Sequence, residues 1–257
     1  MFSISDSLTI AAAFGNFLLG FIILFKNPRK LLNITFSLFS FVAVLWILAN
    51  FIFKYYDSGL ILKSQYALGA LIMPLALIWI YVLVDGKINK KKVIWISIIC
   101  IALSSAVYLD GLFISDFLTN NGNAQIIKGP LFDYYGFFIL GFFLFFVYKL
   151  IVSIRRFPDR TSKIQLWFTL WGVILFAGIS IFVGFILPLF NIILVGPYDA
   201  QSSLFFVTLS AYAILRHKLF DLKIITTELL VSGIWLFLLV KILLSASLTD
   251  KIGRAHV

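Results

Sequence analysis

The stretch that decides the fold is LTIAAAFGNFLLGFIILF at residues 8–25, which is followed directly by KNPRK at residues 26–30. An α-helix of about 20 mainly apolar residues crosses the hydrocarbon core of a bilayer. A strand exposed to lipid would leave backbone hydrogen-bonding groups without partners, so a helix is the conformation that the membrane allows. The basic residues after the run suit the headgroup region. This stretch therefore predicts a transmembrane helix.

The same pattern recurs along the chain. Of its 257 residues, 62% are hydrophobic and only 12% are charged, which is more apolar surface than the core of a soluble domain can bury. We expect an all-α, polytopic transmembrane helical bundle of about eight spans. The fifth span reaches full length if Lys149 extends to the headgroups, and the seventh if Asp199 lies there. The expected spans are Leu8–Phe25, Ile34–Phe53, Tyr66–Val84, Val93–Leu109, Tyr134–Ile154, Leu166–Leu189, Tyr198–Leu215 and Leu229–Ser247.

Basic residues mark one side of this bundle. The even-numbered connections hold only Lys54, Lys63 and Lys128. Because short cytoplasmic loops are enriched in Lys and Arg, the asymmetry predicts an external N-terminus. The net charge of +10 is then an orientation signal, and we expect the lipid bilayer, and no nucleic acid, as the partner. The odd-numbered connections hold fifteen cations: Lys26, Arg29, Lys30, Lys87, Lys90, Lys91, Lys92, Lys149, Arg155, Arg156, Arg160, Lys163, Arg216, Lys218 and Lys223.

The longest outer connection, Asp110–Leu131, contains the turn sequence NNGN at residues 120–123 between two apolar segments. Asn and Gly adopt the backbone conformations that tight turns need. Two alternatives remain open for this segment: a short hairpin over the mouth of the bundle, or a solvated loop.

Polar and aromatic side chains within the spans are candidates either for a ligand cavity or for helix packing. They are Asn16, Trp46, Asn50 and Trp79. Asn16 lies between Ala12 and Gly20 on one face of the first span, where small residues allow close approach and the amide can bond to another helix. Trp46 and Asn50 share a face in the outer half of the second span. Packing is the commoner role of such residues in helical bundles.

Catalytic constellations are missing from the sequence. Its two histidines form no HExxH motif, and there is no GxSxG motif and no glycine-rich phosphate loop. The single cysteine, Cys100, excludes a disulfide or a thiolate metal cluster within one chain. We therefore predict no catalytic residue, no metal site and no cofactor here, and the residues leave open whether the whole protein is an enzyme. Spans without a deep Asp or Glu also argue against an ion-coupled carrier.

The strongest local signal is YAILRHKLFDL at residues 212–222. It resembles the end of the N-terminal seven-transmembrane region of bacterial sensor histidine kinases, which carries a YAIxRxxLFD pattern. Further matches follow in the same order: GN at residues 15–16, NPRK at residues 27–30, Trp46 with Asn50, and GP at residues 196–197. The resemblance covers roughly residues 8–222. An eighth span departs from the simplest members and is similar to a subset with additional spans before the kinase.

The resemblance implies a membrane sensor region, residues 1–222, whose signal-exit motif contains Arg216, His217, Leu219, Phe220 and Asp221. Residues 223–251 are expected to add a transmembrane helix of a truncated chain, and residues 252–257, IGRAHV, resemble a translated sequencing adapter. The implied parent is a sensor histidine kinase of the bacterial inner (cytoplasmic) membrane. Its partners would be a second copy, joined through the missing kinase region, and a response regulator. A small-solute transporter, or another integral membrane protein without a kinase, is the alternative.

Overall fold

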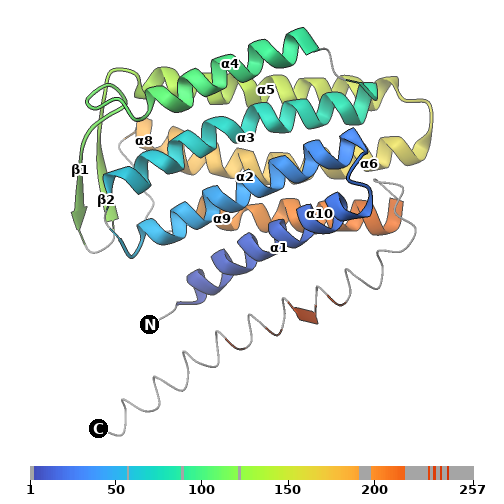
Figure 1. The fold of residues 1–257 in the computed structure, drawn as a ribbon, viewed down its shortest axis with the longest axis horizontal. Coiled ribbons are helices and arrows are strands. Elements are labelled where there is room, and N and C mark those ends of the chain that lie inside the picture. The colour runs from blue at the N-terminus through green and yellow to red at the C-terminus, as the bar shows by residue number, and fades with distance from the viewer. Residues whose placement is uncertain are drawn as a thin grey trace, which may run out of the picture.

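The computed structural model describes residues 3–56, 58–87, 90–120, 123–190 and 198–217, together with positions 231, 234, 235, 238 and 242. Its helices run side by side along one axis, and a two-stranded sheet lies at one end of the bundle (Figure 1). The elements are α1 (Ile4–Lys26), α2 (Leu31–Phe53), α3 (Gly59–Asp85), α4 (Lys90–Ala106), β1 (Ile114–Asn120), β2 (Asn123–Lys128), α5 (Phe132–Arg156), α6 (Arg160–Val173), η1 (Ile174–Gly178), α7 (Ile179–Ile181), η2 (Phe182–Ile186), α8 (Leu187–Leu189), α9 (Tyr198–Gln201) and α10 (Ser203–His217).

The bundle is built to cross a membrane. Within the described residues, five helical runs are long and apolar enough to do so: α1, α2, α3, α5 and the continuous run Arg160–Leu189. This last run follows α5 and contains α6 to α8, and it is called the sixth helical run. Large apolar side chains such as Phe21, Trp95 and Phe137 are exposed, as expected of a surface that faces lipid. The predicted fold class, an all-α polytopic membrane bundle, is confirmed. The predicted eighth span, Leu229–Ser247, lies almost wholly outside the described residues.

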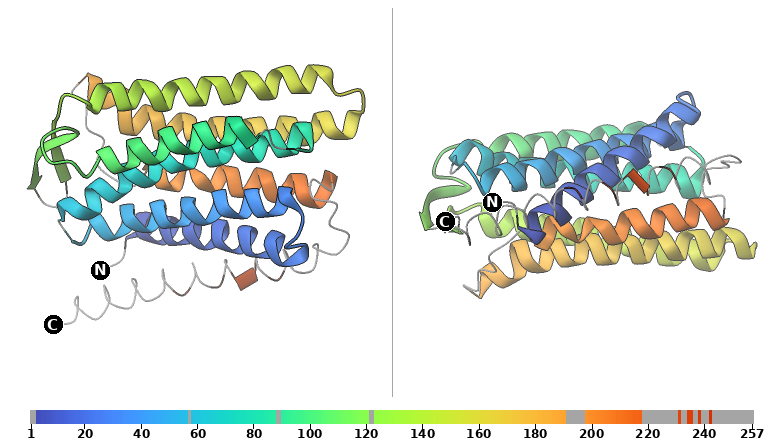
Figure 2. Two further views of the ribbon diagram at one scale, coloured as in Figure 1. Left: turned by 45° about the horizontal axis from the view of Figure 1, so that its top comes forward. Right: turned by 90° about the horizontal axis from the view of Figure 1, so that it is seen from below.

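The two ends of the bundle differ in charge. One end, called the hairpin end, holds β1, β2, the start of α1 and the connection between α2 and α3 (Figure 1). The opposite end, called the basic end, holds the connections from α1 to α2, from α3 to α4 and from α5 to α6 (Figure 2). Most of the cations predicted for the cytoplasmic side lie in or next to these connections. The predicted orientation therefore places the hairpin end outside the cell.

Reporter fusions test this orientation. We expect fusions after Lys30, Lys92, Lys163 and Lys223 to report a cytoplasmic location, because each position follows a basic cluster. Fusions within residues 120–123 should report an external location. Alkaline phosphatase and green fluorescent protein give opposite signals on the two sides, so paired fusions control for expression. Two or more sites on the opposite side would contradict the orientation.

Of the two alternatives for the segment after α4, the hairpin is the one that forms. β1 and β2 pair antiparallel, with Asn120 opposite Asn123 beside the turn. Lys128 Nζ donates a hydrogen bond of 2.8 Å to the Pro188 carbonyl of α8, which attaches the hairpin to the sixth helical run. In the connection before β1, Asp110 pairs with Lys63 of α3, and this hydrogen bond holds the pKa of Asp110 below its usual value.

Helices α1 and α2 approach closely along a face of small residues. A Cβ atom at Gly20 would lie 3.0 Å from Ser40 Cβ, so a larger residue would force the helices apart. Ser37 Oγ donates a hydrogen bond of 2.7 Å to the Gly20 carbonyl. Nearby, Asn33 Nδ2 donates one of 2.9 Å to the Ile23 carbonyl. The small face that the sequence shows in the first span is therefore a helix contact.

Ion pairs join helices at both ends of the bundle. At the hairpin end, Lys54 Nζ lies 2.6 Å from Asp6 Oδ1 and connects the end of α2 to the start of α1. At the basic end, Lys149 Nζ lies 3.0 Å from Asp85 Oδ2 and connects α5 to α3. Lys149 therefore reaches the end of the bundle, as its predicted extension toward the headgroups requires.

The sixth helical run is not a regular α-helix. Two π-helical segments, η1 and η2, interrupt it in the half nearer the hairpin end. The sequence predicts a helix over Leu166–Leu189 but does not indicate these segments. A π turn changes the direction of the side chains that follow it, and such turns are frequent at functional sites. We therefore expect a functional site beside the irregular half of this run.

Candidate functional site

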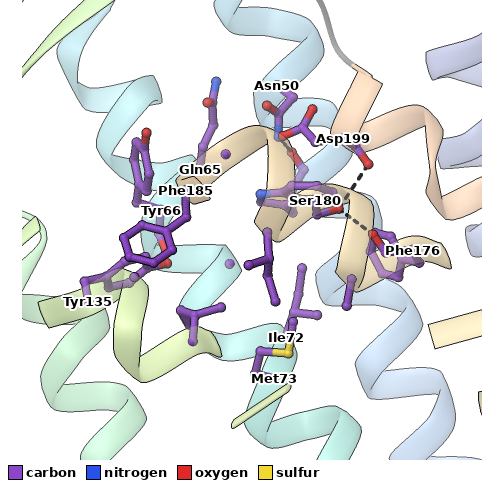
Figure 3. Close-up of a pocket in the computed structure, with 17 residues that line it drawn as sticks. Asn50, Gln65, Tyr66, Ile72, Met73, Tyr135, Phe176, Ser180, Phe185 and Asp199 are labelled. Atoms are coloured by element: carbon purple, nitrogen blue, oxygen red, sulfur yellow. Dashed lines mark hydrogen bonds between the residues drawn. The ribbon is translucent and has the colours of Figure 1, made fainter. Parts of the chain in front are cut away.

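A cavity of about 140 Å³ lies beside the two π-helical segments (Figure 3). It is formed by α2, α3, α5, the sixth helical run and α9, in each case by the part nearer the hairpin end. A space of this size admits a small organic molecule or several waters. The lining residues are Trp46, Asn50, Gln65, Tyr66, Gly69, Ile72, Met73, Tyr135, Gly136, Ile139, Phe176, Ala177, Ser180, Ile181, Gly184, Phe185 and Asp199.

Aromatic rings form much of the apolar wall. Trp46 of α2 packs against Phe176 of η1, with ring centroids 5.9 Å apart. Tyr66 and Tyr135 meet edge to face at 6.0 Å, and the Tyr135 hydroxyl donates a hydrogen bond of 2.5 Å to the Tyr66 carbonyl. Phe185 of η2 lies beside these two tyrosines (Figure 3). A ligand in the cavity would therefore meet aromatic rings from several helices.

Two glycines make room for this wall. A Cβ atom at Gly69 of α3 would lie 3.3 Å from the Tyr135 hydroxyl. A Cβ atom at Gly136 of α5 would lie only 1.7 Å from Phe185 Cε2. Phe185 can therefore occupy its position only because residue 136 has no side chain. Packing, and not an unusual backbone conformation, requires glycine at this position.

Two amide side chains present hydrogen-bond acceptors at the cavity. Asn50 Nδ2 donates a hydrogen bond of 2.9 Å to the Trp46 carbonyl, and Gln65 Nε2 donates one of 3.2 Å to the Ala49 carbonyl. Both nitrogens are thereby held against the backbone of α2. Neither amide oxygen has a hydrogen-bond partner among the residues that the structure describes. These oxygens are therefore open to a ligand that donates hydrogen bonds.

Asp199 of α9 brings a carboxylate to the cavity, next to Asn50 (Figure 3). Its Oδ1 accepts a hydrogen bond of 2.7 Å from the Ala200 backbone N–H. No Lys, Arg or His in the described part of the chain forms an ion pair with it. Its backbone carbonyl accepts hydrogen bonds from Ser180 Oγ at 3.2 Å and Ser202 Oγ at 2.5 Å. Asp199 is therefore held in place by hydrogen bonds, but no basic side chain of the described residues neutralises its carboxylate.

The four candidate residues of the spans divide into two pairs. Trp46 and Asn50 line the cavity, whereas Asn16 and Trp79 are fully buried between helices. Asn16 Nδ2 donates a hydrogen bond of 3.1 Å to Ser203 Oγ and so joins α1 to α10. Trp79 lies among aromatic rings, and its Nε1 has no hydrogen-bond partner among the described residues. Asn16 and Trp79 therefore lie in contacts between helices and outside the lining of the cavity.

The predicted signal-exit motif is only partly described. Arg216 and His217 end α10. Leu219, Phe220 and Asp221 lie outside the described residues, so the role of the motif stays a prediction. The helix that leads to it starts beside the cavity, because α10 follows α9 and its Asp199 almost directly.

Aromatic packing closes the bundle on the basic-end side of the cavity. Phe36, Phe39, Trp79 and Phe206 are each at most 2% exposed. The rings of Trp79 and Phe206 meet edge to face with centroids 6.0 Å apart. Phe176 of the cavity wall also reaches this cluster, with its centroid 6.2 Å from that of Phe206 on α10. Direct contacts therefore lead from the cavity to the helix that carries the exit motif.

Sequence reasoning missed most of the polar cavity. It assigned Asp199 to the headgroup region and did not single out Gln65, Tyr66, Tyr135 or Ser180. Four of them, Asp199, Gln65, Tyr66 and Tyr135, lie at or next to the end of an expected span, where polar and aromatic residues are common for reasons unrelated to ligands. Their convergence is a property of helix packing and carries no signal in the sequence.

The geometry and the sequence resemblance are the basis on which a function can be proposed. In comparisons with known proteins, no family model, no curated protein and no solved structure matches this chain.

Proposed function

We propose that this chain is the membrane-embedded input region of a bacterial two-component sensor histidine kinase, located in the inner membrane. A small molecule entering the cavity would be the stimulus. The catalytic steps would belong to a kinase domain outside these residues, which acts as a dimer and passes its phosphoryl group to a response regulator. The resemblance of residues 212–222, with its matches in the same order upstream, supports the kinase assignment.

The position of the cavity is the observation that carries the proposal. Its lining comes from the hairpin-end parts of the helices, and the buried rings of Phe36, Phe39, Trp79 and Phe206 fill the bundle beneath it. A transporter needs a polar pathway on both sides of the midplane, whereas a sensor needs only a pocket on the side of its stimulus. With the predicted orientation, this cavity lies in the outer half of the bundle. That arrangement favours sensing.

The sixth helical run offers a mechanism for passing on the signal. Phe176 in η1 contacts Trp46 in the cavity and Phe206 on α10. Its carbonyl accepts hydrogen bonds from Ser180 Oγ at 2.8 Å and from Ser202 Oγ at 3.1 Å. A ligand that displaces Phe176 would therefore change both ring packing and hydrogen bonding at the start of α10. A small shift of α10 would reach the exit motif as a displacement or rotation.

A small-solute transporter is the second candidate. The observation in its favour is the cavity itself, in which a carboxylate lies beside an irregular helix. Such interrupted helices bind substrates in many carriers. A second conformation with the aromatic cluster opened would be required. Uptake into proteoliposomes, driven by a solute gradient, would distinguish this candidate from a sensor.

The kinase proposal is tested in the longer gene that the resemblance implies. We expect its reading frame to continue past codon 251 into a further span and a kinase domain. In membranes of that protein, Asp221→Ala should change autophosphorylation about twofold or more, because Asp221 can pair with the nearby basic residues differently in two positions of the helix.

Membrane levels of this variant should stay near those of the wild type, since an ion pair at headgroup level contributes only ~0–1 kcal/mol. Asp133→Ala, at an exposed carboxylate of α5 that does not line the cavity, is the matched control and should leave both quantities unchanged. A stop codon soon after position 251 would refute the kinase assignment. A lower membrane level with unchanged autophosphorylation per molecule would show that the motif has only a structural role.

A further inference from the structure

We propose that the cavity binds a small organic cation, an amine or quaternary ammonium group, with Asp199 as its counter-charge and the surrounding aromatic rings as its cage. The inference names the ligand class of the cavity and rests on the proposed sensor function. Three independent properties of the lining residues lead to it: their charge, their aromatic content and the direction of their free hydrogen-bonding groups.

The charge of the lining selects cations. Asp199 is an acid, and no Lys, Arg or His is present among the lining residues, although the whole chain carries a net charge of +10. A carboxylate surrounded by apolar groups interacts with a charged ligand more strongly than it would in water. A cation would therefore be stabilised and an anion repelled. A neutral ligand would displace water from Asp199 and leave its charge without a partner.

The aromatic wall favours an organic cation over a metal ion. Trp46, Tyr66, Tyr135, Phe176 and Phe185 all line the cavity. The negative faces of such rings attract ammonium groups, and quaternary ammonium ligands are commonly held in aromatic cages. Metal ions instead require several close ligand atoms. Within the described residues, no group of three or more His, Cys, Asp or Glu side chains is arranged to hold one.

The amide oxygens of the lining are free acceptors. One N–H of each of Asn50 and Gln65 is bonded to a backbone carbonyl of α2, which fixes the amide group, and its oxygen accepts from none of the described residues. The Ser180 hydroxyl donates to the carbonyls of Phe176 and Asp199 and is therefore not a free donor. An amine or a hydroxylated ammonium compound can donate to these acceptors, whereas a carboxylate or phosphate cannot. Hydrogen bonding and charge therefore favour the same ligand class.

Choline and its uncharged analogue 3,3-dimethyl-1-butanol test the proposal, because the two molecules have nearly the same shape. The purified chain is placed in nanodiscs of phosphatidylglycerol, which has no amine headgroup, and binding is measured by calorimetry. Tryptophan fluorescence gives a second readout, since Trp46 lines the cavity. We expect saturable choline binding that is at least about tenfold tighter than binding of the neutral analogue.

Three variants show whether Asp199 causes this preference. Asp199→Asn should reduce it to about twofold or less, and Asp199→Glu, which keeps the charge, should retain most of it. Asp133→Asn, on the same end of the bundle but outside the cavity, should bind both probes as the wild type does. Equal affinities for the two probes, persistence of the preference in Asp199→Asn, or no saturable choline binding would each overturn the proposal.

A second lipid composition identifies the source of the cation. An amine can come from a free solute or from the headgroup of phosphatidylethanolamine. If that lipid weakens choline binding, the headgroup competes for the cavity; if affinity is unchanged, a free amine is the ligand. Either result supports the cation class. The binding assay needs no kinase domain, so a negative result would refute only the proposed ligand class. A negative autophosphorylation test would refute the proposed sensor function.

Discussion

Replacing Gly136 by alanine is expected to destabilise the bundle and to deform the cavity. The added Cβ atom would overlap the Phe185 ring, only 1.7 Å from its Cε2 atom. Phe185 is 6% exposed and its ring meets that of Phe137 edge to face, with centroids 5.4 Å apart, so it cannot move aside without displacing its neighbours. Overpacking of this kind typically costs about 1–3 kcal/mol. Thermal unfolding in detergent, followed by fluorescence-detected size-exclusion chromatography, should show a lower midpoint.

A second glycine of α5 provides the matched control. A Cβ atom at Gly141 would meet nothing within 4 Å, so Gly141→Ala should be neutral or slightly stabilising. Combining Gly136→Ala with Phe185→Leu should recover part of the lost stability, because the smaller side chain can vacate the overlap. Equal effects of the two glycine variants would show that the close contact between α5 and η2 does not form.

Replacing Lys54 by methionine is expected to loosen the hairpin end of α1. The Asp6 side chain is 1% exposed and lies 2.6 Å from Lys54 Nζ. Without that ammonium group, its carboxylate retains hydrogen bonds from the Ser3 N–H and Oγ, at 2.6 Å and 2.7 Å, and from the Tyr55 side chain. The loss should amount to about 1–3 kcal/mol, since Lys54 is itself 37% exposed and water can replace part of its contribution. Hydrogen exchange at the start of α1 should increase.

A lysine with an exposed partner separates this effect from a general loss of charge. Lys63 pairs with Asp110, whose side chain is 95% exposed, so Lys63→Met should have no measurable effect on stability. Asp6→Asn introduced together with Lys54→Met should restore part of the stability, because no buried charge then remains unpaired. If Lys54→Met and Lys63→Met lower stability equally, the burial of Asp6 does not explain the contribution of the Lys54–Asp6 pair.

The sensor proposal and the cation inference depend on the same irregular helix. η1 and η2 both contribute side chains to the cavity, and Phe176 in η1 also contacts α10. A π turn and a regular α turn are alternative arrangements that differ by one residue in each turn. Ligand binding that favours one arrangement would rotate the side chains beyond it. Local rearrangement in this run can therefore couple the cavity to α10.

Some features could be predicted from residue types and spacing. The length of the apolar runs and the position of basic clusters predict the helices over Leu8–Phe25 and Ile34–Phe53, and the structure confirms the helical membrane bundle. The turn sequence at residues 120–123 allowed the hairpin without deciding between it and a loop. Small residues around Asn16 indicated close helix contact. In each case the signal is local, because a helix or turn forms from neighbouring residues in the chain.

The sequence by itself therefore determined that the chain is helical, crosses a membrane several times and carries its cations at one end, because hydrophobic length and charge act segment by segment. Only the tertiary structure decided which polar residues meet. Asp199 approaches Asn50 from a distant part of the chain, Phe185 fits against Gly136, and Trp79 lies in the core instead of the cavity. These outcomes depend on helix rotation and on the two π turns, which follow from the packing of all helices together and from no single segment.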